Sequence, residues 1–387
     1  MRAALSLRPG ATIGIIGGGQ LGRMSAAAAA RLGFHVHVYA THADCPASEV
    51  ARHVSIGAYD DAEALRAFAS RVDVVTFEFE NVSAAGLAVL EELRVVRPSR
   101  DILEVSQDRI IEKTRLSEIG VALAPWRPVR NRKELDAAVE ALGHHLILKT
   151  TRLGYDGKGQ FRVLSADDLT ALPAELPYPL VAEGVIAFDR ELSVMVARGT
   201  DGTTRCFDVT QNIHRNGILD LSLAPAPIPS ELADRATRLA TRVADGLGLV
   251  GIMGVEMFVD AEGALLVNEI APRPHNSAHW TMNACLVDQF EMHIRAVAGL
   301  PLPPATRHSD AAMKNLIGPD DMTLCDMIFR TPGQSLHLYG KAEARPGRKM
   351  GHVNIIFPRG SLPGRVGLAA ALGPLADFDP EDGSENF

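Results

Sequence analysis

Two glutamates about two thirds of the way along the chain suggest a site for a divalent metal. Glu256 and Glu269 lie in two apolar, strand-like runs separated by the turn 260–263. This pattern predicts a β-hairpin that places the two carboxylates on neighbouring strands, with Asn268 beside them. Mg²⁺ prefers oxygen ligands and usually takes one or two carboxylates, while nucleotide phosphates complete its shell. The pair indicates phosphoryl transfer, although a carboxylate in an alternating strand can also simply face solvent.

An unusually polar loop follows Glu269 directly. Between two prolines and a tryptophan the chain carries Arg273, His275, Asn276 and Ser277. Loops held by a rigid sheet are common places for binding residues. We expect this loop to bind an anion beside the metal.

Lys149 ends an apolar strand and precedes a loop with three glycines, residues 152–160. Its ammonium group could reach phosphate oxygens that the loop covers as a lid. The glycines allow close approach of the backbone, but their spacing is that of neither a Walker A motif nor a kinase loop. A mobile surface loop with solvated charges is the alternative interpretation.

The turn Gly17–Gly22 matches the dinucleotide fingerprint, with an apolar strand before it and an Ala-rich helix after it. A nicotinamide oxidoreductase is therefore a rival hypothesis. That reading needs an acidic residue at the end of the second strand, where Tyr39 and Ala40 stand and Asp44 lies farther on. Amides at a helix N-terminus still attract a phosphate, so a substrate phosphate could bind there.

Further polar side chains stand near expected strand ends. Glu78 and Glu80 end a parallel strand, the edge at which open α/β sheets bind ligands. Segment 345–354 supplies Arg345, Arg348 and Lys349, whose ordinary interpretation is a solvated basic turn. Glu183, Glu191 and His214 are each ambiguous when taken alone.

Composition limits the class of protein. With 387 residues, 47% of them hydrophobic, the chain can form two or three globular domains. Its net charge of −8 and lack of a long basic cluster argue against nucleic acid or an anionic membrane as the main partner. Four scattered cysteines signal neither zinc nor disulfides, and no segment is long and apolar enough to span a bilayer. We expect a soluble, cytoplasmic protein with reduced thiols.

The expected elements mix α/β and α+β organisation. Strands and helices alternate up to about residue 107, which predicts a doubly wound parallel sheet. A second domain follows at residues 108–304, with a mixed-sheet subdomain at about 126–186. Short strands predict a small β-rich module at 305–365, and the acidic tail 366–387 is expected to be disordered.

Five segments in this order, GGGQLGRM, TFEFENV, KTTRLGYDGKGQ, NEIAPRPHNSAHW and RPGRKMGHV, resemble the ATP-grasp ligases. Within that family they resemble the 5-(carboxyamino)imidazole ribonucleotide synthases of purine (IMP) biosynthesis, also described as the ATPase subunit of phosphoribosylaminoimidazole carboxylase. The resemblance covers residues 12 to about 357. It implies a three-part fold: a pre-ATP-grasp sheet, a central ATP-grasp module and the C-terminal module. It also implies a homodimer.

The resemblance assigns roles residue by residue. It implies ATP contacts at Arg109, Lys149, Gly154, Tyr155, Asp156, Gly157, Lys158, Gly159, Gln160, Glu183, Gly184, Val185, Ile186, Glu191, His214, Asn268 and Glu269. Mg²⁺, with Mn²⁺ as a substitute, is expected on Glu256 and Glu269. Substrate contacts are expected at Gly19, Gln20, Leu21, Glu78, His275, Arg348 and Lys349. The catalytic group is expected to be Asp156, Lys158, Arg273, Asn276 and Lys349.

The reaction implied by this resemblance joins bicarbonate to 5-aminoimidazole ribonucleotide at the expense of ATP, through carboxyphosphate. Bicarbonate is a poor electrophile, which is why it is first phosphorylated. Asp156 is expected to orient or deprotonate the substrate amine, while Arg273 and Asn276 hold bicarbonate. A formate-using glycinamide ribonucleotide transformylase or a biotin carboxylase would share the metal pair and the lysine. The segments around Glu78 and Lys349 favour the aminoimidazole enzyme.

Overall fold

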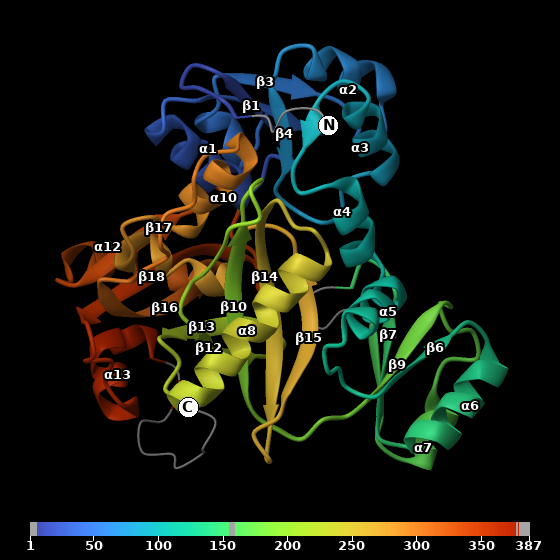
Figure 1. The fold of residues 1–387 in the computed structure, drawn as a ribbon. Coiled ribbons are helices and arrows are strands. Elements are labelled where there is room, and N and C mark those ends of the chain that lie inside the picture. Colours follow the sequence, from blue (N-terminus) through green and yellow to red (C-terminus); the bar gives the residue numbers. More distant parts are fainter. Residues whose placement is uncertain (1–5, 155–158, 377, 379–387) are drawn as a thin grey trace.

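The computed structural model describes residues 6–154, 159–376 and 378. The N-terminal part is a parallel sheet of order β3-β2-β1-β4-β5 with helices on both faces (Figure 1). Its strands are β1 (Thr12–Ile16), β2 (His35–Ala40), β3 (His53–Ile56), β4 (Val74–Phe77) and β5 (Val95–Val96). Its helices are α1 (Gln20–Arg31), η1 (Pro46–Glu49), α2 (Ala62–Ala69), α3 (Ala84–Glu91) and α4 (Arg100–Gln107). The predicted doubly wound sheet is confirmed, and its strand order reverses at β1, beside the glycine turn.

A large antiparallel sheet forms the centre of the molecule. Its order is β15-β14-β10-β12-β13-β16-β18-β17, with β11 paired to β10. The first part comprises β10 (Phe188–Arg198), β11 (Thr204–Cys206), β12 (Thr210–Arg215), β13 (Ile218–Ala224), β14 (Gly251–Asp260) and β15 (Leu265–Ala271). The rest comprises β16 (Ser309–Ile317), β17 (Gln334–Leu338) and β18 (Lys349–Pro358). Strand β16 pairs with β13, so the C-terminal strands continue the central sheet.

Helices attach the other parts to this sheet. α8 (Ser230–Gly246) buries an apolar stripe on one face of β10 and β14. α10 (Gln289–Ala298) packs between the central sheet and α1, and Phe290 and Ile294 belong to the core of the N-terminal domain. α5 (Arg109–Ile119) leads from the first domain toward the lid. The loop after β15 contains η2 (Asn276–Ala278) and α9 (Thr281–Ala284).

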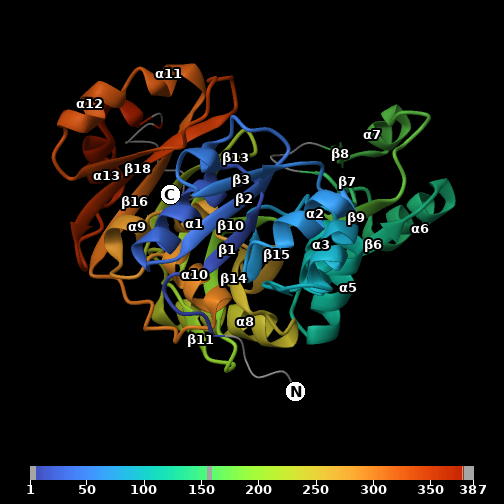
Figure 2. The same ribbon diagram turned by 90° about the horizontal axis from the view of Figure 1, so that it is seen from above.

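A separate antiparallel sheet of order β6-β9-β7-β8 forms the lid subdomain, at the edge of the molecule in both views (Figures 1 and 2). Its strands are β6 (Trp126–Val129), β7 (Leu146–Thr150), β8 (Gln160–Val163) and β9 (Leu180–Gly184). Helices α6 (Arg132–Leu142) and α7 (Ala166–Ala171) belong to it. Leu135, Leu146 and Leu148 are fully buried within its own small core.

The first part of the segment that was predicted to be a disordered tail is helical and packed. The C-terminal helices are α11 (Gly318–Met322), α12 (Cys325–Arg330), α13 (Arg365–Leu372) and η3 (Gly373–Leu375). Leu368 and Leu372 of α13 are buried against Val353 and Ile355 of β18. The prediction is therefore wrong for residues 366–376, because their apolar face has a partner in the sheet. Residue 377 and residues 379–387 lie outside the described part of the chain.

Candidate active site

A row of polar side chains crosses four adjacent strands of the central sheet. Glu269 on β15 pairs with Glu256 on β14, and Glu256 pairs with Ser193 on β10. Glu191 of β10 faces Asn212 of β12. Because side chains alternate along a strand, the intervening residues face the apolar core under α8. The predicted hairpin is confirmed, and a β-bulge at Asn268 interrupts its register beside the glutamates.

The two facing carboxylates differ in their electrostatics. Burial, and then the charge of Glu269, raise the pKa of Glu256 to about 7. Burial also acts on Glu269, but Arg109, at 3.2 Å, and Lys149 hold its pKa below the ordinary value. The pair therefore carries one firmly ionised carboxylate and one that ionises only near neutral pH. A cation between them would relieve this repulsion.

A hydrogen-bonded chain orients Glu256 from the interior of the protein. The Ser193 hydroxyl donates to the Ser277 hydroxyl at 2.8 Å, and Ser277 Oγ lies 2.8 Å from His275 Nδ1. The Ser277 backbone N–H also points to Nδ1, so this nitrogen is the acceptor. His275 Nε2 then faces Glu256 Oε1 at 3.0 Å as the donor. Burial and the neighbouring cations place the pKa of His275 well below its usual value, which keeps the ring neutral.

The oxygen donors of Glu256, Glu269 and Asn268 fit Mg²⁺, and they do not fit a metal whose ligands all come from the protein. No group of three or more His, Cys, Asp or Glu side chains suited to a metal occurs among the described residues. Two facing carboxylates with a bulged Asn268 beside them leave most of a coordination shell to phosphate and water, as Mg²⁺ prefers. The two carboxylates repel each other, and a cation bound between them would be favoured because it relieves this repulsion.

Lys149 contacts a carboxylate on the neighbouring strand of the lid. Its Nζ lies 2.8 Å from Glu183 Oε2, and Lys113 Nζ of α5 lies 3.1 Å from the other oxygen. Burial would raise the pKa of Glu183, but the two lysines lower it to about 2. Lys149 also acts electrostatically on Glu269 of the central sheet. It therefore lies at the boundary between lid and sheet, as a phosphate-binding lysine requires.

The connector after β9 and the glycine loop border the same region. The Gly184 N–H donates to the Pro125 carbonyl and the Val185 N–H to His145, which fixes the path toward Ile186. Gly159 has a positive φ of 72°, and its carbonyl accepts from the Thr150 N–H at the base of the loop. Gly154 and Gln160 flank the loop. The predicted residues Tyr155, Asp156, Gly157 and Lys158 lie outside the described residues, so their roles stay predictions.

Glu191 and His214 form an ion pair on the same face of the sheet. Glu191 Oε2 lies 2.6 Å from His214 Nδ1. Burial opposes protonation of His214, but this carboxylate outweighs it and raises the pKa of the ring. Glu256 strengthens the effect and Lys349 weakens it, which places Lys349 within electrostatic reach of the row.

The glycine turn already holds a carboxylate. Glu78 accepts hydrogen bonds from the N–H groups of Gly19 and Gly22, the latter at 2.7 Å. These amides at the start of α1, beside Gln20 and Leu21, were expected to hold the substrate phosphate. Glu78 therefore takes up both amides in this structure, and the predicted phosphate contact of the turn stays a prediction. A dinucleotide pyrophosphate would have to displace Glu78 from these amides, which argues against the oxidoreductase hypothesis.

The polar loop after β15 connects three parts of the molecule. Arg273 forms a 2.7 Å ion pair with Glu80 of the N-terminal domain. Asn276 exchanges two amide hydrogen bonds, of 2.9 and 2.8 Å, with Asn315 of β16. Arg348, predicted as a substrate contact, donates to the Glu343 carbonyl, and no described contact joins it to the carboxylate row. Its predicted role stays untested.

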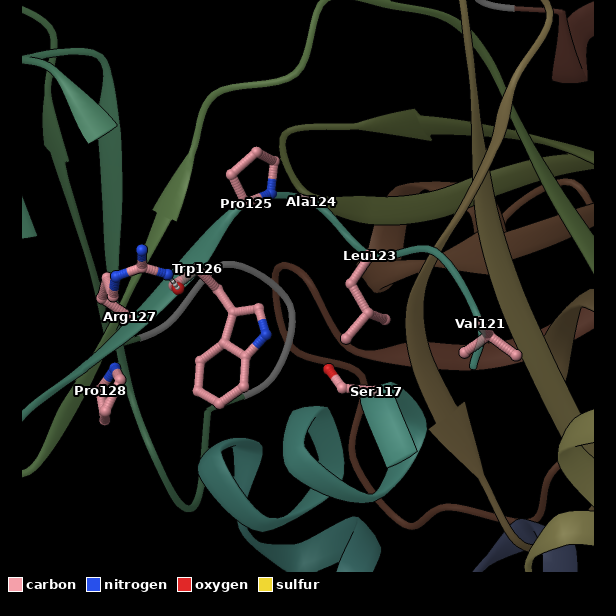
Figure 3. Close-up of a pocket in the computed structure, with 8 residues that line it drawn as sticks. All are labelled: Ser117, Val121, Leu123, Ala124, Pro125, Trp126, Arg127 and Pro128. Atoms are coloured by element: carbon pink, nitrogen blue, oxygen red, sulfur yellow. Dashed lines mark hydrogen bonds between the residues drawn. The ribbon is translucent and has the colours of Figure 1, made fainter. Parts of the chain in front are cut away.

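A pocket of about 520 Å³ lies where the chain passes from α5 to β6, and its lining residue Leu123 is bridged to Val267 of β15 (Figure 3). Its lining is Ser117, Val121, Leu123, Ala124, Pro125, Trp126, Arg127 and Pro128. Arg127 is the one charged side chain of that lining, so the pocket lacks the groups that phosphoryl transfer needs. We assign the chemistry to the carboxylate row.

Sequence reasoning missed several residues of the site. Lys113 stands four residues after Arg109, the helical spacing that places both on one face of α5. Ser193 stands two residues after Glu191, the strand spacing for one face. Lys341, whose charge acts on Glu78, gave no such local signal.

Comparisons with known proteins agree with this geometry. The N5-carboxyaminoimidazole ribonucleotide synthase of Brucella melitensis biotype 1 is 50% identical over 357 residues, which cover 92% of this chain and 98% of that protein. The chain belongs to this family of ATP-grasp ligases. Three domain families match within it: ribonucleotide synthetase preATP-grasp domain at residues 10–107, ATP-grasp domain at 114–290, and phosphoribosylaminoimidazole carboxylase C-terminal domain at 311–360. The predicted family and three-part fold are confirmed.

Solved structures of the synthase family superpose closely on this chain. The Staphylococcus aureus N5-carboxyaminoimidazole synthetase, complexed with ADP, has a TM-score of 0.87 at 38% identity, covering 91% of this chain and 94% of that one. The Aspergillus clavatus synthase, in complex with ADP and 5-aminoimidazole ribonucleotide, has a TM-score of 0.87 at 31% identity, covering 95% and 98%. In the part of this chain that the structure describes, no helix is long and apolar enough to cross a membrane.

Proposed function

We propose that this chain carboxylates 5-aminoimidazole ribonucleotide with bicarbonate in de novo purine synthesis, converting ATP to ADP and phosphate. The observation that carries the proposal is the facing pair Glu256 and Glu269, with Arg109 and Lys149 close by. A relative of the same fold is described as a complex with ADP and the same ribonucleotide. The C-terminal domain match supports this substrate over glycinamide ribonucleotide with formate.

The first step forms carboxyphosphate. A bicarbonate oxygen attacks the γ-phosphorus of ATP, and the bond from that phosphorus to the β,γ-bridging oxygen breaks, releasing ADP. Negative charge spreads over the transferring group, and Arg109 and Lys149 offset it from two sides. Mg²⁺, or Mn²⁺ in its place, would be held by Glu256 and Glu269 and would neutralise phosphate charge when bound. Glu191 and His214 lie on the same face, Asn268 stands in the bulge beside Glu269, and we assign all three to contacts with the nucleotide.

The second step forms the carbon–nitrogen bond. The substrate amine attacks the carbonyl carbon of carboxyphosphate, or CO₂ released from it; phosphate leaves and the amine loses a proton. We assign bicarbonate to Arg273 and Asn276. The ion pair with Glu80 holds Arg273 in place, and the amide hydrogen bonds with Asn315 hold Asn276. Lys349 lies near enough to add positive charge on the substrate side. The predicted proton acceptor, Asp156, lies outside the described residues.

Two further features belong to the proposal. The family resemblance supports a homodimer, and the scattered free cysteines Cys45, Cys206, Cys285 and Cys325 support a reducing, cytoplasmic location. Size-exclusion chromatography with light scattering tests the first. Localisation of a tagged chain in cells tests the second.

Phosphate release from ATP with Mg²⁺ and bicarbonate tests the function. We expect strong stimulation by 5-aminoimidazole ribonucleotide in the wild type and its loss in Glu269→Gln, which removes the charge but keeps the shape. The control is Glu262→Gln, at an exposed position in the turn of the same hairpin. Equal turnover in all three proteins, or stimulation by glycinamide ribonucleotide and formate instead, would refute the proposal.

A further inference from the structure

One buried carboxylate is shared by two lysines from different elements. Glu183 on β9 is 5% exposed, Lys149 on β7 is 11% exposed and Lys113 on α5 is 1% exposed. Each lysine takes one carboxylate oxygen, at 2.8 Å for Lys149 and 3.1 Å for Lys113. This arrangement carries one more positive than negative charge. A single lysine would have sufficed to neutralise Glu183.

Lys113, the second lysine, matters when Lys149 turns from Glu183 to a nucleotide. A nucleotide phosphate attracts the Lys149 ammonium group and competes with Glu183 for it. Without another partner, Glu183 would remain as an unpaired charge in the protein interior, which is strongly unfavourable. Lys113 stays in place because its side chain is enclosed on α5. One helical turn earlier on the same face, Arg109 holds Glu269.

We propose that Lys113 is a positioning residue that keeps Glu183 neutralised, so that Lys149 is free to move to the nucleotide. The inference rests on the proposed function only for the role of Lys149. In this account α5 supplies two fixed counter-charges: Arg109 for Glu269 of the central sheet and Lys113 for Glu183 of the lid. Lys113 itself touches no reacting atom.

The test compares Lys113→Met with Lys113→Arg and with the matched control Arg115→Met. Arg115 lies on the same helix, where it makes an exposed ion pair with Glu118. We expect Lys113→Met to raise the KM for ATP about tenfold, since Lys149 is then the sole partner of Glu183 and a charge-assisted contact must be given up. The KM for the ribonucleotide should change less than about twofold, because Lys113, Lys149 and Glu183 are not among its predicted contacts. Lys113→Arg should recover most of the ATP affinity, and the control should behave as wild type.

A second readout uses ADP binding by calorimetry. In the double variant Lys113→Met/Glu183→Gln no carboxylate retains Lys149, so ADP should bind more tightly than to Lys113→Met alone. Should Lys113→Met fail to fold, Lys113→Gln takes its place. An unchanged KM for ATP, parallel increases in both KM values, or no recovery in the double variant would overturn the proposal. A wild type without ribonucleotide-stimulated phosphate release would refute the proposed function, whereas ADP binding would still test Lys113.

Discussion

Replacing Glu256 by glutamine should stabilise the metal-free protein at alkaline pH and have little effect in acid. Glutamine keeps the size of the side chain and can still accept a hydrogen bond from His275 Nε2. What it removes is a largely buried charge that faces Glu269 on the neighbouring strand. The substitution therefore isolates the repulsion to which we attribute metal binding.

The pKa of Glu256 sets the size and sign of the effect. The folded protein holds this pKa at about 7, against an ordinary value of 4.5. Below pH 4.5 the group is protonated in both the folded and unfolded states, so it has no effect on stability. Between 4.5 and 7 the unfolded chain releases the proton first, and the free energy of unfolding falls with rising pH. Above pH 7 the decrease in the free energy of unfolding levels off at about 3 kcal/mol, because each pKa unit of the shift corresponds to ~1.36 kcal/mol.

Urea unfolding with EDTA measures this penalty. Both proteins should carry Trp126→Phe, so that fluorescence reports Trp280, which is fully buried beside the central sheet. The free energy of unfolding of Glu256→Gln should exceed that of the parent by about 3 kcal/mol at pH 8 and by less than ~1 kcal/mol at pH 5. Mg²⁺ with ADP should reduce the difference in free energy of unfolding at pH 8. The cation binds the Glu256 carboxylate of the folded parent and stabilises the parent more than the variant. A stability difference that does not change with pH would refute the electrostatic reasoning.

Three other substitutions test separate parts of the structure. Lys149→Met should lower ribonucleotide-stimulated phosphate release by about 100-fold or more, while its urea midpoint stays close to wild type because Lys113 still neutralises Glu183; activity within tenfold of wild type would contradict the assignment. Glu78→Gln should destabilise the protein by about 1–3 kcal/mol in urea unfolding, since the two amides of the glycine turn no longer share one carboxylate; a phosphate site there would instead predict tighter substrate binding with unchanged stability. Leu368→Ala should cost about 2–5 kcal/mol by the same assay, because this side chain is fully buried in α13; no loss would mean that α13 does not pack on the sheet.

The local pattern of the sequence was sufficient to predict the hairpin and the first sheet. Alternating apolar residues around Glu256 and Glu269, with a turn between them, define strand faces without knowledge of the rest of the chain. Lys149 and Glu183 were also recognisable, each near the end of an apolar strand. Their mutual contact was not predicted, since it depends on how β7 and β9 pair.

Contacts between distant segments account for what the sequence did not predict. Glu78 occupies the glycine turn although 59 residues separate it from Gly19, and no periodicity encodes that meeting. The strands of the C-terminal module were found, but their place in the central sheet follows from the pairing of β16 with β13, far apart in sequence. Helix α13 looked like part of a tail because its burial depends on β18.

Oxygen-18-labelled bicarbonate offers the most direct test of the central claim, that the chain phosphorylates bicarbonate and passes its carbon to the ribonucleotide. Wild-type protein would be incubated with labelled bicarbonate, ATP, Mg²⁺ and 5-aminoimidazole ribonucleotide, and the phosphate analysed by mass spectrometry. The account predicts one labelled oxygen in each phosphate released, with an equal amount of carboxylated ribonucleotide. Phosphate that carries no label would show that water, not bicarbonate, receives the phosphoryl group, and would contradict the account.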